Sequence, residues 1–344
     1  MSTRKQQARY YGEADPRRLT YLEFGSIDRT AGRKDVWDFR VHQQAYDFFM
    51  LARYTNDLML CRRLGAAARG RRFGPALKQY AAGVHANDFP IVPARLAAGH
   101  TLARRVGERP VTLLELGSTL MGCIDQLETL QAIGARAGDR FSTVDLSRMR
   151  YRGVDISPLL NDVARALHPQ HAIRVSTRAA SARADLFVAK GVTLLYAAPR
   201  VTDLVRWITG AEVALFDYSF ALDRPQRRHL GTGKQVLFHA LGEVVDRCTA
   251  RGRAVLMRAG TCRYDPASGR LRGQCYCGEP RLLRRVIDEE WRLMGLLAEA
   301  VGSAGADLPD LFERATWPPT LAAFRRDFVR VDRLARRVAP SPAS

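Results

Sequence analysis

The sequence predicts a doubly wound α/β domain with a mostly parallel sheet, preceded by an N-terminal helical cap. Two observations lead to this fold class. Residues 111–117, VTLLELG, form an apolar run followed at once by small residues and a helical stretch, which is typical of a strand buried on both faces. Strand-like and helical segments then alternate as far as residue 278, whereas residues 1–108 contain helical stretches only. We therefore place the cap at 1–108, the α/β core at 109–278 and a C-terminal helical extension at 279–344.

The individual elements follow from the same periodicities. Residues 94–106 are expected to form the last helix of the cap. Ser157 and Pro158 mark a helix start, since serine caps helices and proline fits their first position. A turn at 265–269 is expected to join two strands into a hairpin. The predicted strands are 111–117, 151–156, 172–177, 192–197, 211–220, 252–264 and 270–278. The later predicted helices are 157–169, 199–209, 234–250, 279–301 and 321–338.

The composition is that of a globular chain. The protein has 344 residues, 47% of them hydrophobic and 26% charged, which excludes disorder and fibrous repeats. No apolar run approaches the roughly 20 residues that cross a bilayer, and the first 18 residues have no apolar signal core. The six cysteines are too sparse for a disulfide framework. We therefore expect a soluble cytoplasmic protein without a membrane partner; its oligomeric state stays open.

The net charge of +19 raises the question of nucleic-acid binding. Only five of the 54 basic residues are lysines, so 49 are arginines, and they are spread along the chain beside many Ala, Gly and Leu residues. No helix-turn-helix or RNP-type pattern surrounds the two densest runs, at 69–72 and 333–337. This distribution is typical of a GC-rich genome, and we expect a small-molecule substrate and no nucleic-acid partner.

Polar groups follow the first two predicted strands of the core. Ligands of doubly wound sheets bind at the carboxyl ends of strands, where the strand order reverses. Gly117 permits a sharp turn and close approach to a ligand there, and Ser118 offers a hydroxyl. Asp155 ends the second strand, where a carboxylate can bind both ribose hydroxyls. Glu115 lies inside a buried strand, so we expect it to bind a loop amide or a ligand's amine. The pattern indicates a nucleoside site.

These residues carry a resemblance to a known fold. LLELGS and GVDIS resemble the glycine motif and the ribose-binding acidic motif of the class I S-adenosylmethionine (SAM) dependent methyltransferase fold, and the resemblance covers about residues 111–260. It departs from that fold in having one glycine in place of three and a gap before Asp155 longer than the roughly 20 residues expected. A dinucleotide-binding dehydrogenase is the competing interpretation, but G-x-G-x-x-G is absent. The resemblance implies SAM as ligand, bound by Glu115, Gly117, Ser118, Asp155, Ile156, Asp217 and Tyr218.

A narrower resemblance rests on LELGSTLMGCIDQLE, GVDISPLLNDVA, KGVTLLYA and LFDYSF, together with the helical cap. These segments resemble the azetidine-2-carboxylate synthases. That resemblance implies that SAM is the substrate: its α-amino nitrogen attacks the carbon next to sulfur, a four-membered ring closes, and 5′-methylthioadenosine leaves. Methyl transfer to a small molecule of secondary metabolism is the alternative function. A binding module without enzymatic activity is the third interpretation.

Cyclisation favours particular side chains. Its amine must be neutral to attack, so neutral hydrogen-bond acceptors suit it better than carboxylates, which stabilise the ammonium form. Asn161, Tyr196 and Ser219 supply such groups near predicted strand ends, and we expect them to be catalytic. Each has a structural alternative, as a helix-surface amide, a core aromatic or a turn hydroxyl. Asp217 is either a general base or an orienting group. The aromatic rings considered for contact with the sulfonium are Tyr10, Tyr11, Tyr218 and Phe220.

No metal site is predicted. Cys275 and Cys277 lie two residues apart on one strand face, and Cys262 can face them across the hairpin, but no second pair with zinc spacing exists. The histidines form no H-x-x-x-H or H-E-x-x-H pattern, and no G-x-S-x-G elbow is present. Cysteine packing is the simpler interpretation, and hydrolase chemistry is disfavoured.

Overall fold

The computed structural model describes residues 91–118, 148–155, 158–169, 171–175, 183–189, 197–229, 235–303 and 320–338, together with positions 124, 127, 128, 194 and 195. The predictions for residues 1–90, which include Tyr10 and Tyr11, lie outside the described residues. The same holds for Ile156, Ser157 and Tyr196.

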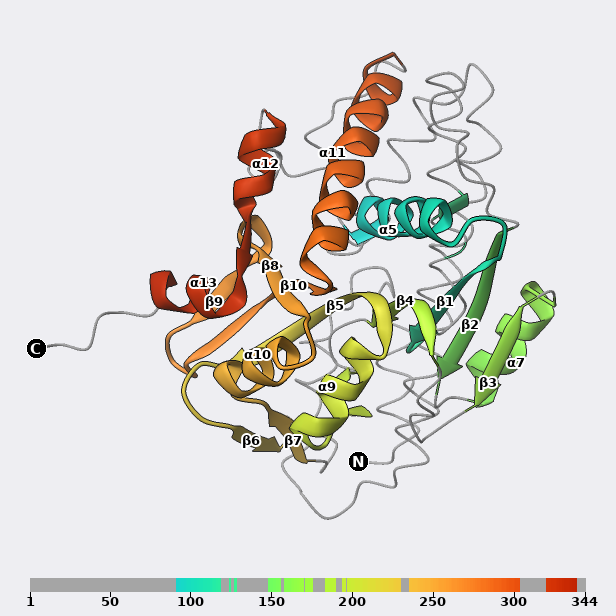
Figure 1. Ribbon diagram of the computed structural model, residues 1–344. Helices are drawn as coiled ribbons and strands as arrows, with labels where there is room; N and C mark the ends of the chain where they lie inside the picture. Colours follow the sequence, from blue (N-terminus) through green and yellow to red (C-terminus); the bar gives the residue numbers. More distant parts are fainter. Residues whose placement is uncertain are drawn as a thin grey trace, which may run out of the picture.

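A nine-stranded sheet forms the centre of the described structure (Figure 1). Its strand order is β11-β8-β10-β5-β4-β1-β2-β3, and β9 pairs with β10 beside that path. Strands β3, β2, β1, β4 and β5 run parallel, whereas β10 is antiparallel to β5, β8 and β9. The bounds are β1 (Val111–Leu116), β2 (Met149–Asp155), β3 (Ala172–Val175), β4 (Ala184–Ala189), β5 (Ala211–Ala221), β8 (Ala254–Arg258), β9 (Arg263–Asp265), β10 (Arg270–Gly278) and β11 (Phe328–Arg330).

Helices cover both faces of this sheet. They are α5 (Ile91–Val106), α7 (Pro158–Leu167), α9 (Val201–Thr209), α10 (Leu241–Thr249), α11 (Pro280–Ser303), α12 (Leu321–Asp327) and α13 (Val331–Val338), with a short 3-10 turn, η3 (Ala259–Thr261). A separate two-stranded ribbon pairs β6 (Gln226–His229) with β7 (Gln235–Phe238). None of the helices in the described part of the chain is long and apolar enough to cross a membrane.

The alternation of side chains along each strand builds two cores. In β5, Val213 and Leu215 face α5 and α11, whereas Ala214 and Phe216 face α9 and α10, because successive strand residues point to opposite faces. Figure 1 shows α5 and α11 side by side over one face, with α9 and α10 over the other. The sheet is therefore buried on both sides, as the apolar run at 111–117 predicts.

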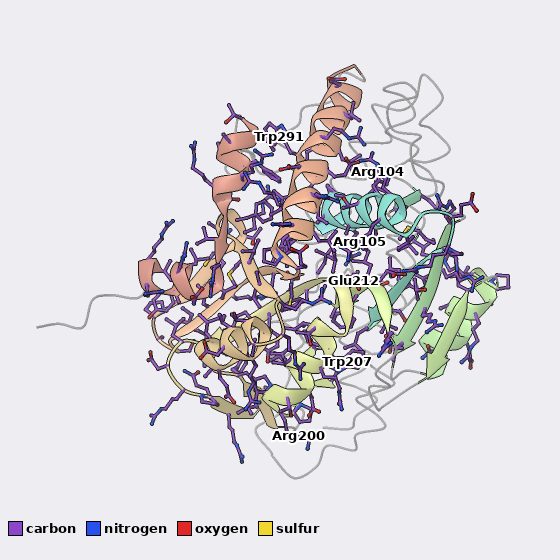
Figure 2. All side chains as sticks on the ribbon, in the orientation of Figure 1. Arg104, Arg105, Arg200, Trp207, Glu212 and Trp291 are labelled. Carbon is purple, nitrogen blue, oxygen red and sulfur yellow. The ribbon has the colours of Figure 1, made fainter. Side chains whose placement is uncertain are left out.

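The last predicted cap helix packs directly on the sheet. Residues 94–106 are helical as predicted, and α5 begins three residues earlier, with Pro93 in its first turn, where a proline lacks no needed donor. Leu96 and Leu102 are fully buried in the core that α5 shares with α11. His100 Nδ1 lies 3.0 Å from Glu289 Oε1 on α11. Figure 2 shows Arg105, whose guanidinium lies 3.5 Å from the Glu212 carboxylate of β5.

One predicted strand of the core is wrong. Leu194, Leu195 and Ala197 are helical, and Ala198 N–H donates to Leu194 O at 3.0 Å, so these residues of the strand predicted at 192–197 are not in a strand. The fourth parallel strand is instead β4, which sequence reasoning missed. Both segments are short apolar runs, and periodicity does not separate a buried helix turn from a buried strand. Phe187 of β4 packs on Trp207 of α9, labelled in Figure 2, with ring centroids 5.3 Å apart.

Three further predictions need correction. The helix predicted at 234–250 is a strand, β7, followed by the shorter α10. The strand predicted at 252–264 is interrupted by η3, so that β8 and β9 are separate. The helix predicted at 321–338 is divided by β11, whose three residues pair with β8 at the sheet edge. In the first and third cases, pairing with a neighbouring strand outweighs local helical preference. The hairpin of β9 and β10 is confirmed.

Candidate active site

The strand order reverses beside β1. The chain runs outward from β1 to β2 and β3 and then returns to β4 on the other side of β1, which is where doubly wound sheets bind ligands. Leu116 pairs with Val154 and with Ala189, and Ala189 pairs with Phe216. The residues next in the chain after Leu116, Val154 and Phe216 are Gly117, Asp155 and Asp217. These three residues therefore lie in one row at the carboxyl edge of the sheet.

Gly117 makes the turn at the end of β1. Its φ of +74° lies in the left-handed region, where a side chain costs about 1–2 kcal/mol. Its N–H donates to Val154 O at 2.7 Å, and Ser118 N–H donates to the same oxygen at 3.3 Å. These bonds tie the turn to β2, so the backbone after β1 is held at the end of the neighbouring strand.

Ser118 lies in a space that Gly153 leaves open. A Cβ atom at Gly153 would approach Ser118 Oγ to 2.7 Å, well inside van der Waals contact. Ser118 is 2% exposed, and its Oγ has no hydrogen-bond partner in the described part of the protein. A buried hydroxyl without a partner costs about 1–3 kcal/mol. The turn after β1 therefore offers a hydrogen-bonding group that a polar ligand can satisfy.

Asp155 and Asn161 lie together at the end of β2. Asp155 is the last residue of the strand and is 7% exposed. Asn161 on α7 is fully buried, and its Nδ2 donates to the backbone oxygen of Asp155 at 3.1 Å. This contact fixes the backbone that carries the Asp155 carboxylate. The predicted contact between Asn161 and a reacting amine stays a prediction.

The buried Glu115 of β1 has a partner that sequence reasoning missed. The Tyr151 hydroxyl of β2 donates to Glu115 Oε2, and both side chains are buried on the face that α5 covers. A tyrosine on the adjacent strand gives this buried carboxylate a hydrogen-bond donor, and the predicted contact with a loop amide or a ligand's amine stays a prediction. Only the pairing of β1 with β2 brings the two residues together, and the sequence gives no signal of their contact.

The end of β5 divides its side chains between the two faces. Asp217 and Ser219 are half-buried and follow Leu215 on the face of α5 and α11. Tyr218 and Phe220 are buried on the opposite face, with ring centroids 4.8 Å apart. Burial raises the pKa of Tyr218, so its hydroxyl stays protonated at neutral pH. The predicted ligand contacts of these two aromatic rings stay predictions.

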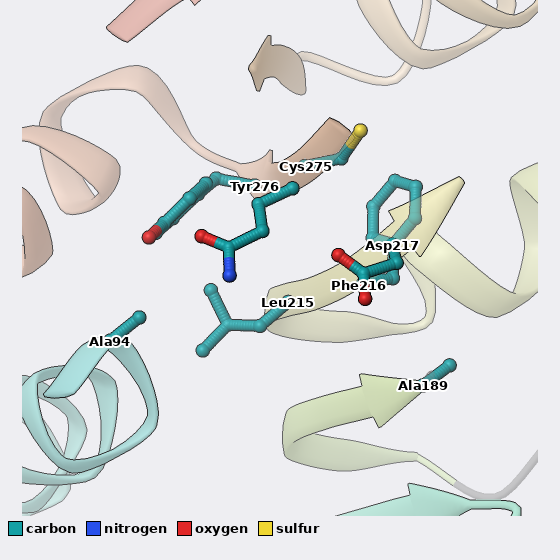
Figure 3. Close-up of a pocket in the computed structure, with 8 residues that line it drawn as sticks. Ala94, Ala189, Leu215, Phe216, Asp217, Cys275 and Tyr276 are labelled. Carbon is teal, nitrogen blue, oxygen red and sulfur yellow. The ribbon is translucent and has the colours of Figure 1, made fainter. Parts of the chain in front are cut away.

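A small hollow opens between β4, β5 and β10 (Figure 3). Asp217 of β5 and Gln274 of β10 are register partners and both line it. Gln274 is 8% exposed, and its Oε1 has no hydrogen-bond partner in the described structure. Gln274 was not among the predicted site residues, because a cross-strand neighbour is not visible before the sheet order is known. The other lining residues are Ala94, Ala189, Leu215, Phe216, Cys275 and Tyr276.

A buried polar cluster stands beside this hollow. Tyr276 lines the hollow, and its hydroxyl donates to Glu290 Oε2 at 3.0 Å. Arg258 lies 3.6 Å from Glu290 Oε1 and 3.3 Å from Asp327 Oδ2. Burial raises the pKa of Glu290 to about 7, although Arg258 and Tyr276 act in the opposite direction. Tyr276 therefore connects the hollow to a buried carboxyl group whose pKa is raised, although Glu290 itself does not line the hollow.

The cysteines near the hollow are packing residues in this geometry. Cys275 and Cys277 are buried in the same core, as predicted from their spacing. Burial raises the pKa of Cys275, and the nearby Asp217 carboxylate raises it further, so the thiol is protonated at neutral pH. Within the described ranges, no three His, Cys, Asp or Glu residues are grouped so as to hold a metal ion.

Several solved structures resemble this one at low sequence identity. An O-methyltransferase of a trans-AT PKS multienzyme from Brevibacillus brevis, in complex with S-adenosyl-L-homocysteine, is 12% identical over 64% of this chain and 84% of that chain, with a TM-score of 0.36. A SAM-bound amino pentose methyltransferase from Micromonospora echinaspora is 12% identical over 58% of this chain and 93% of that chain, with a TM-score of 0.33. No protein-family model and no curated protein matches the sequence.

The fold class follows from the strand order itself. Five parallel strands in the order 3-2-1-4-5, extended by an antiparallel strand inserted between β5 and β8, form the mostly parallel, Rossmann-like sheet of the class I methyltransferase fold. The fold predicted from the sequence is thereby confirmed. Function has to be inferred from the site, because one fold carries many activities.

Proposed function

We propose that the protein is an enzyme that uses SAM, bound at the carboxyl ends of β1 and β2. The observation that carries this proposal is the position of Asp155, which ends β2 beside the Gly117 turn and is held there by Asn161. In a doubly wound sheet, a carboxylate at this place binds the ribose hydroxyls, and a glycine turn lets the backbone approach the ligand. The Ser118 hydroxyl, which has no hydrogen-bond partner among the described residues, suits a polar ligand at the same turn.

We further propose that the reaction is methyl transfer to a small molecule. Asp155 and Asp217 stand on β2 and β5, which β1 and β4 separate. Three strand spacings of about 4.8 Å place the two carboxylates roughly 14 Å apart. A ribose at Asp155 cannot also occupy the hollow at Asp217, so the hollow suits a different group. In a methyl transfer, that group is the acceptor, whose nucleophile attacks the methyl carbon while the departing electron pair stays on sulfur.

Cyclisation of SAM to azetidine-2-carboxylate is the second candidate function. The observation in its favour is Ser219, a neutral and half-buried hydroxyl on the same face of β5 as Asp217. It is the kind of group that orients an amine without protonating it. Against this, Asn161 directs its amide to the backbone of Asp155, at the ribose end of the site. Methyl transfer therefore agrees better with the geometry.

The nucleoside product separates the two reactions. The purified protein is incubated with SAM alone and with SAM plus a library of small acceptors, and the products are identified by chromatography and mass spectrometry. Methyl transfer predicts S-adenosylhomocysteine only when an acceptor is present. Formation of 5′-methylthioadenosine from SAM alone would contradict methyl transfer and support cyclisation.

A further inference from the structure

The hollow at the end of β5 presents two hydrogen-bond acceptors side by side. Asp217 and Gln274 occupy paired positions on antiparallel strands, and side chains at paired positions point to the same face about 5 Å apart. Asp217 is half-buried, and Gln274 is more than nine-tenths buried with its Oε1 without a hydrogen-bond partner in the described structure. A buried carbonyl oxygen of this kind requires a donor, and a neighbouring carboxylate also accepts hydrogen bonds.

The other residues that line the hollow are apolar or uncharged. Figure 3 shows the Asp217 carboxylate near Leu215 and Phe216, with Ala94 and Ala189 on the surrounding elements. None of the described residues that line the hollow is basic, although the chain as a whole has a net charge of +19. The thiol of Cys275 and the phenol of Tyr276 are kept neutral, since burial raises the pKa of both. The described lining of the hollow therefore combines the Asp217 carboxylate and the Gln274 carbonyl with apolar walls.

We propose that Asp217 and Gln274 together bind the amino group of the acceptor, so that the substrate class is a small primary or secondary amine; this inference rests on the proposed methyl transfer. An amine presents two or three N–H donors and can satisfy both side chains at once, whereas a hydroxyl presents one donor. The carboxylate attracts a protonated amine, and because it also stabilises the ammonium form, it must take up a proton before the nitrogen can attack. Phosphate esters and carboxylic acids are disfavoured, because each would bring a second negative charge to Asp217.

The site supplies the groups that methyl transfer to an amine requires. The Asp217 carboxylate accepts a proton from the bound ammonium, and the freed nitrogen lone pair attacks the methyl carbon of SAM. The C–S bond breaks, its electron pair stays on sulfur, and S-adenosylhomocysteine leaves with an N-methylated product. The proton on Asp217 passes to solvent, to which this half-buried side chain has access. In this step Asp217 acts as the base, and the Gln274 carbonyl orients the N–H that remains.

The test is an acceptor library in which each small amine has an alcohol of the same skeleton, such as 2-phenylethylamine and 2-phenylethanol. S-adenosylhomocysteine formation is measured for each compound, and SAM binding is measured separately by calorimetry. We expect amines to be accepted and their matched alcohols to be inert. If SAM binds but only alcohols react, or no amine in the library reacts, the amine assignment is overturned. If SAM does not bind, the proposed function itself fails.

Three variants test the roles of Gln274 and Asp217, with an amine that the enzyme methylates as substrate. We expect Gln274→Leu to raise the KM for the amine at least tenfold, with the Kd for SAM unchanged. Gln274→Glu should restore a KM at or below that of the wild type, because a second carboxylate attracts the cation. Asp217→Asn should lower kcat at least tenfold. The control Asp246→Asn changes an exposed aspartate of α10, on the opposite face. Equal impairment by both Gln274 variants would show a structural role and contradict the proposal.

Discussion

At the residue scale, two glycines shape the turn after β1 in different ways. Gly117 supplies a backbone conformation that other residues rarely adopt, with φ at +74°. Gly153 supplies space, because a Cβ atom there would meet Ser118 Oγ at 2.7 Å and Ser118 Cβ at 2.9 Å. The position of the Ser118 hydroxyl therefore depends on the absence of a side chain at Gly153 of the neighbouring strand.

We predict that Gly153→Ala displaces Ser118 and weakens SAM binding at least fivefold. Overpacking of a tight site also costs stability, typically about 1–3 kcal/mol. The matched control is Gly242→Ala on α10, where a Cβ would meet nothing within 4 Å. Calorimetry with SAM and denaturant unfolding check both variants. If Gly153→Ala and Gly242→Ala bind SAM equally well, the packing of Ser118 against Gly153 does not position the ligand.

Glu290 gives a prediction for the dependence of stability on pH. Burial raises its pKa from the ordinary value of 4.5 to about 7. Between these two pH values the folded protein holds a proton that the unfolded chain has released, so the free energy of unfolding falls as pH rises through this window. The shift corresponds to roughly 3 kcal/mol. Glu290→Gln removes this titration, and its stability relative to the wild type should improve by that amount between pH 5 and pH 8.

Urea unfolding of the wild type and of Glu290→Gln at a series of pH values measures this difference. The exposed Glu108→Gln serves as the control for replacing a surface glutamate by glutamine. A constant difference between wild type and Glu290→Gln from pH 5 to pH 8 would show that Glu290 stays ionised throughout. In that case its pairing with Arg258 would outweigh burial.

Single residues differ in how far the sequence predicts them. Gly117 is found because it directly follows the apolar strand β1, and Asp155 is found because it ends β2 just before a helix start, and both signals are local in the chain. Tyr151 and Gln274 are missed because their partners, Glu115 and Asp217, are distant in sequence and become neighbours only through strand pairing. Local patterns thus locate the strand ends, whereas the side chains that complete a site come from the sheet order.

At the element scale, the least expected feature is that α5 is part of the core. Leu96 and Leu102 of α5 share a buried cluster with β1 and α11. The helix also carries His100, which contacts Glu289 of α11. Burial lowers the pKa of His100, so the imidazole is neutral at physiological pH. Ala94 at the start of α5 lines the hollow beside Asp217, and this helix therefore connects the core to the site.

We predict that Leu102→Ala destabilises the whole described domain by about 2–5 kcal/mol, the usual cost of such a cavity. Arg104→Ala on the exposed side of the same helix is the control, and it should cost less than about 1 kcal/mol because surface ion pairs contribute little. Chemical unfolding followed by tryptophan fluorescence provides the measurement. A loss of α5 in a separate early transition, with the main transition unchanged, would show that α5 is a detachable cap.

The helices and strands also show why part of the topology could not be predicted from the sequence. Strands β1, β2 and β5 are predicted at nearly their observed bounds, because turns or helix starts flank them clearly. The runs ADLFVA and VTLLYA are both apolar and about equally long, so composition cannot decide which one is the strand. The choice depends on pairing with β1 and β5, which ADLFVA makes. Likewise, β11 forms only because the edge of β8 is available to it.

At the scale of the whole molecule, one edge of the sheet holds two different polar sites. The ends of β1 and β2 supply the glycine turn and the Asp155 carboxylate, and the ends of β5 and β10 supply the acceptor-rich hollow. This division matches a reaction between a nucleoside-bearing donor and a second, smaller group. The excess of arginine is spread over the chain.

The measurement that tests SAM use most directly is calorimetric titration of SAM into the wild type, Asp155→Ala and the exposed-site control Asp246→Ala. We predict that the wild type and the control bind SAM with the same Kd. Loss of hydrogen bonds between a carboxylate and two ribose hydroxyls should cost Asp155→Ala about 1.5–3 kcal/mol, which is roughly a ten- to hundredfold increase in Kd. An unchanged Kd for Asp155→Ala, or no binding of SAM to the wild type, would contradict a SAM site at the ends of β1 and β2.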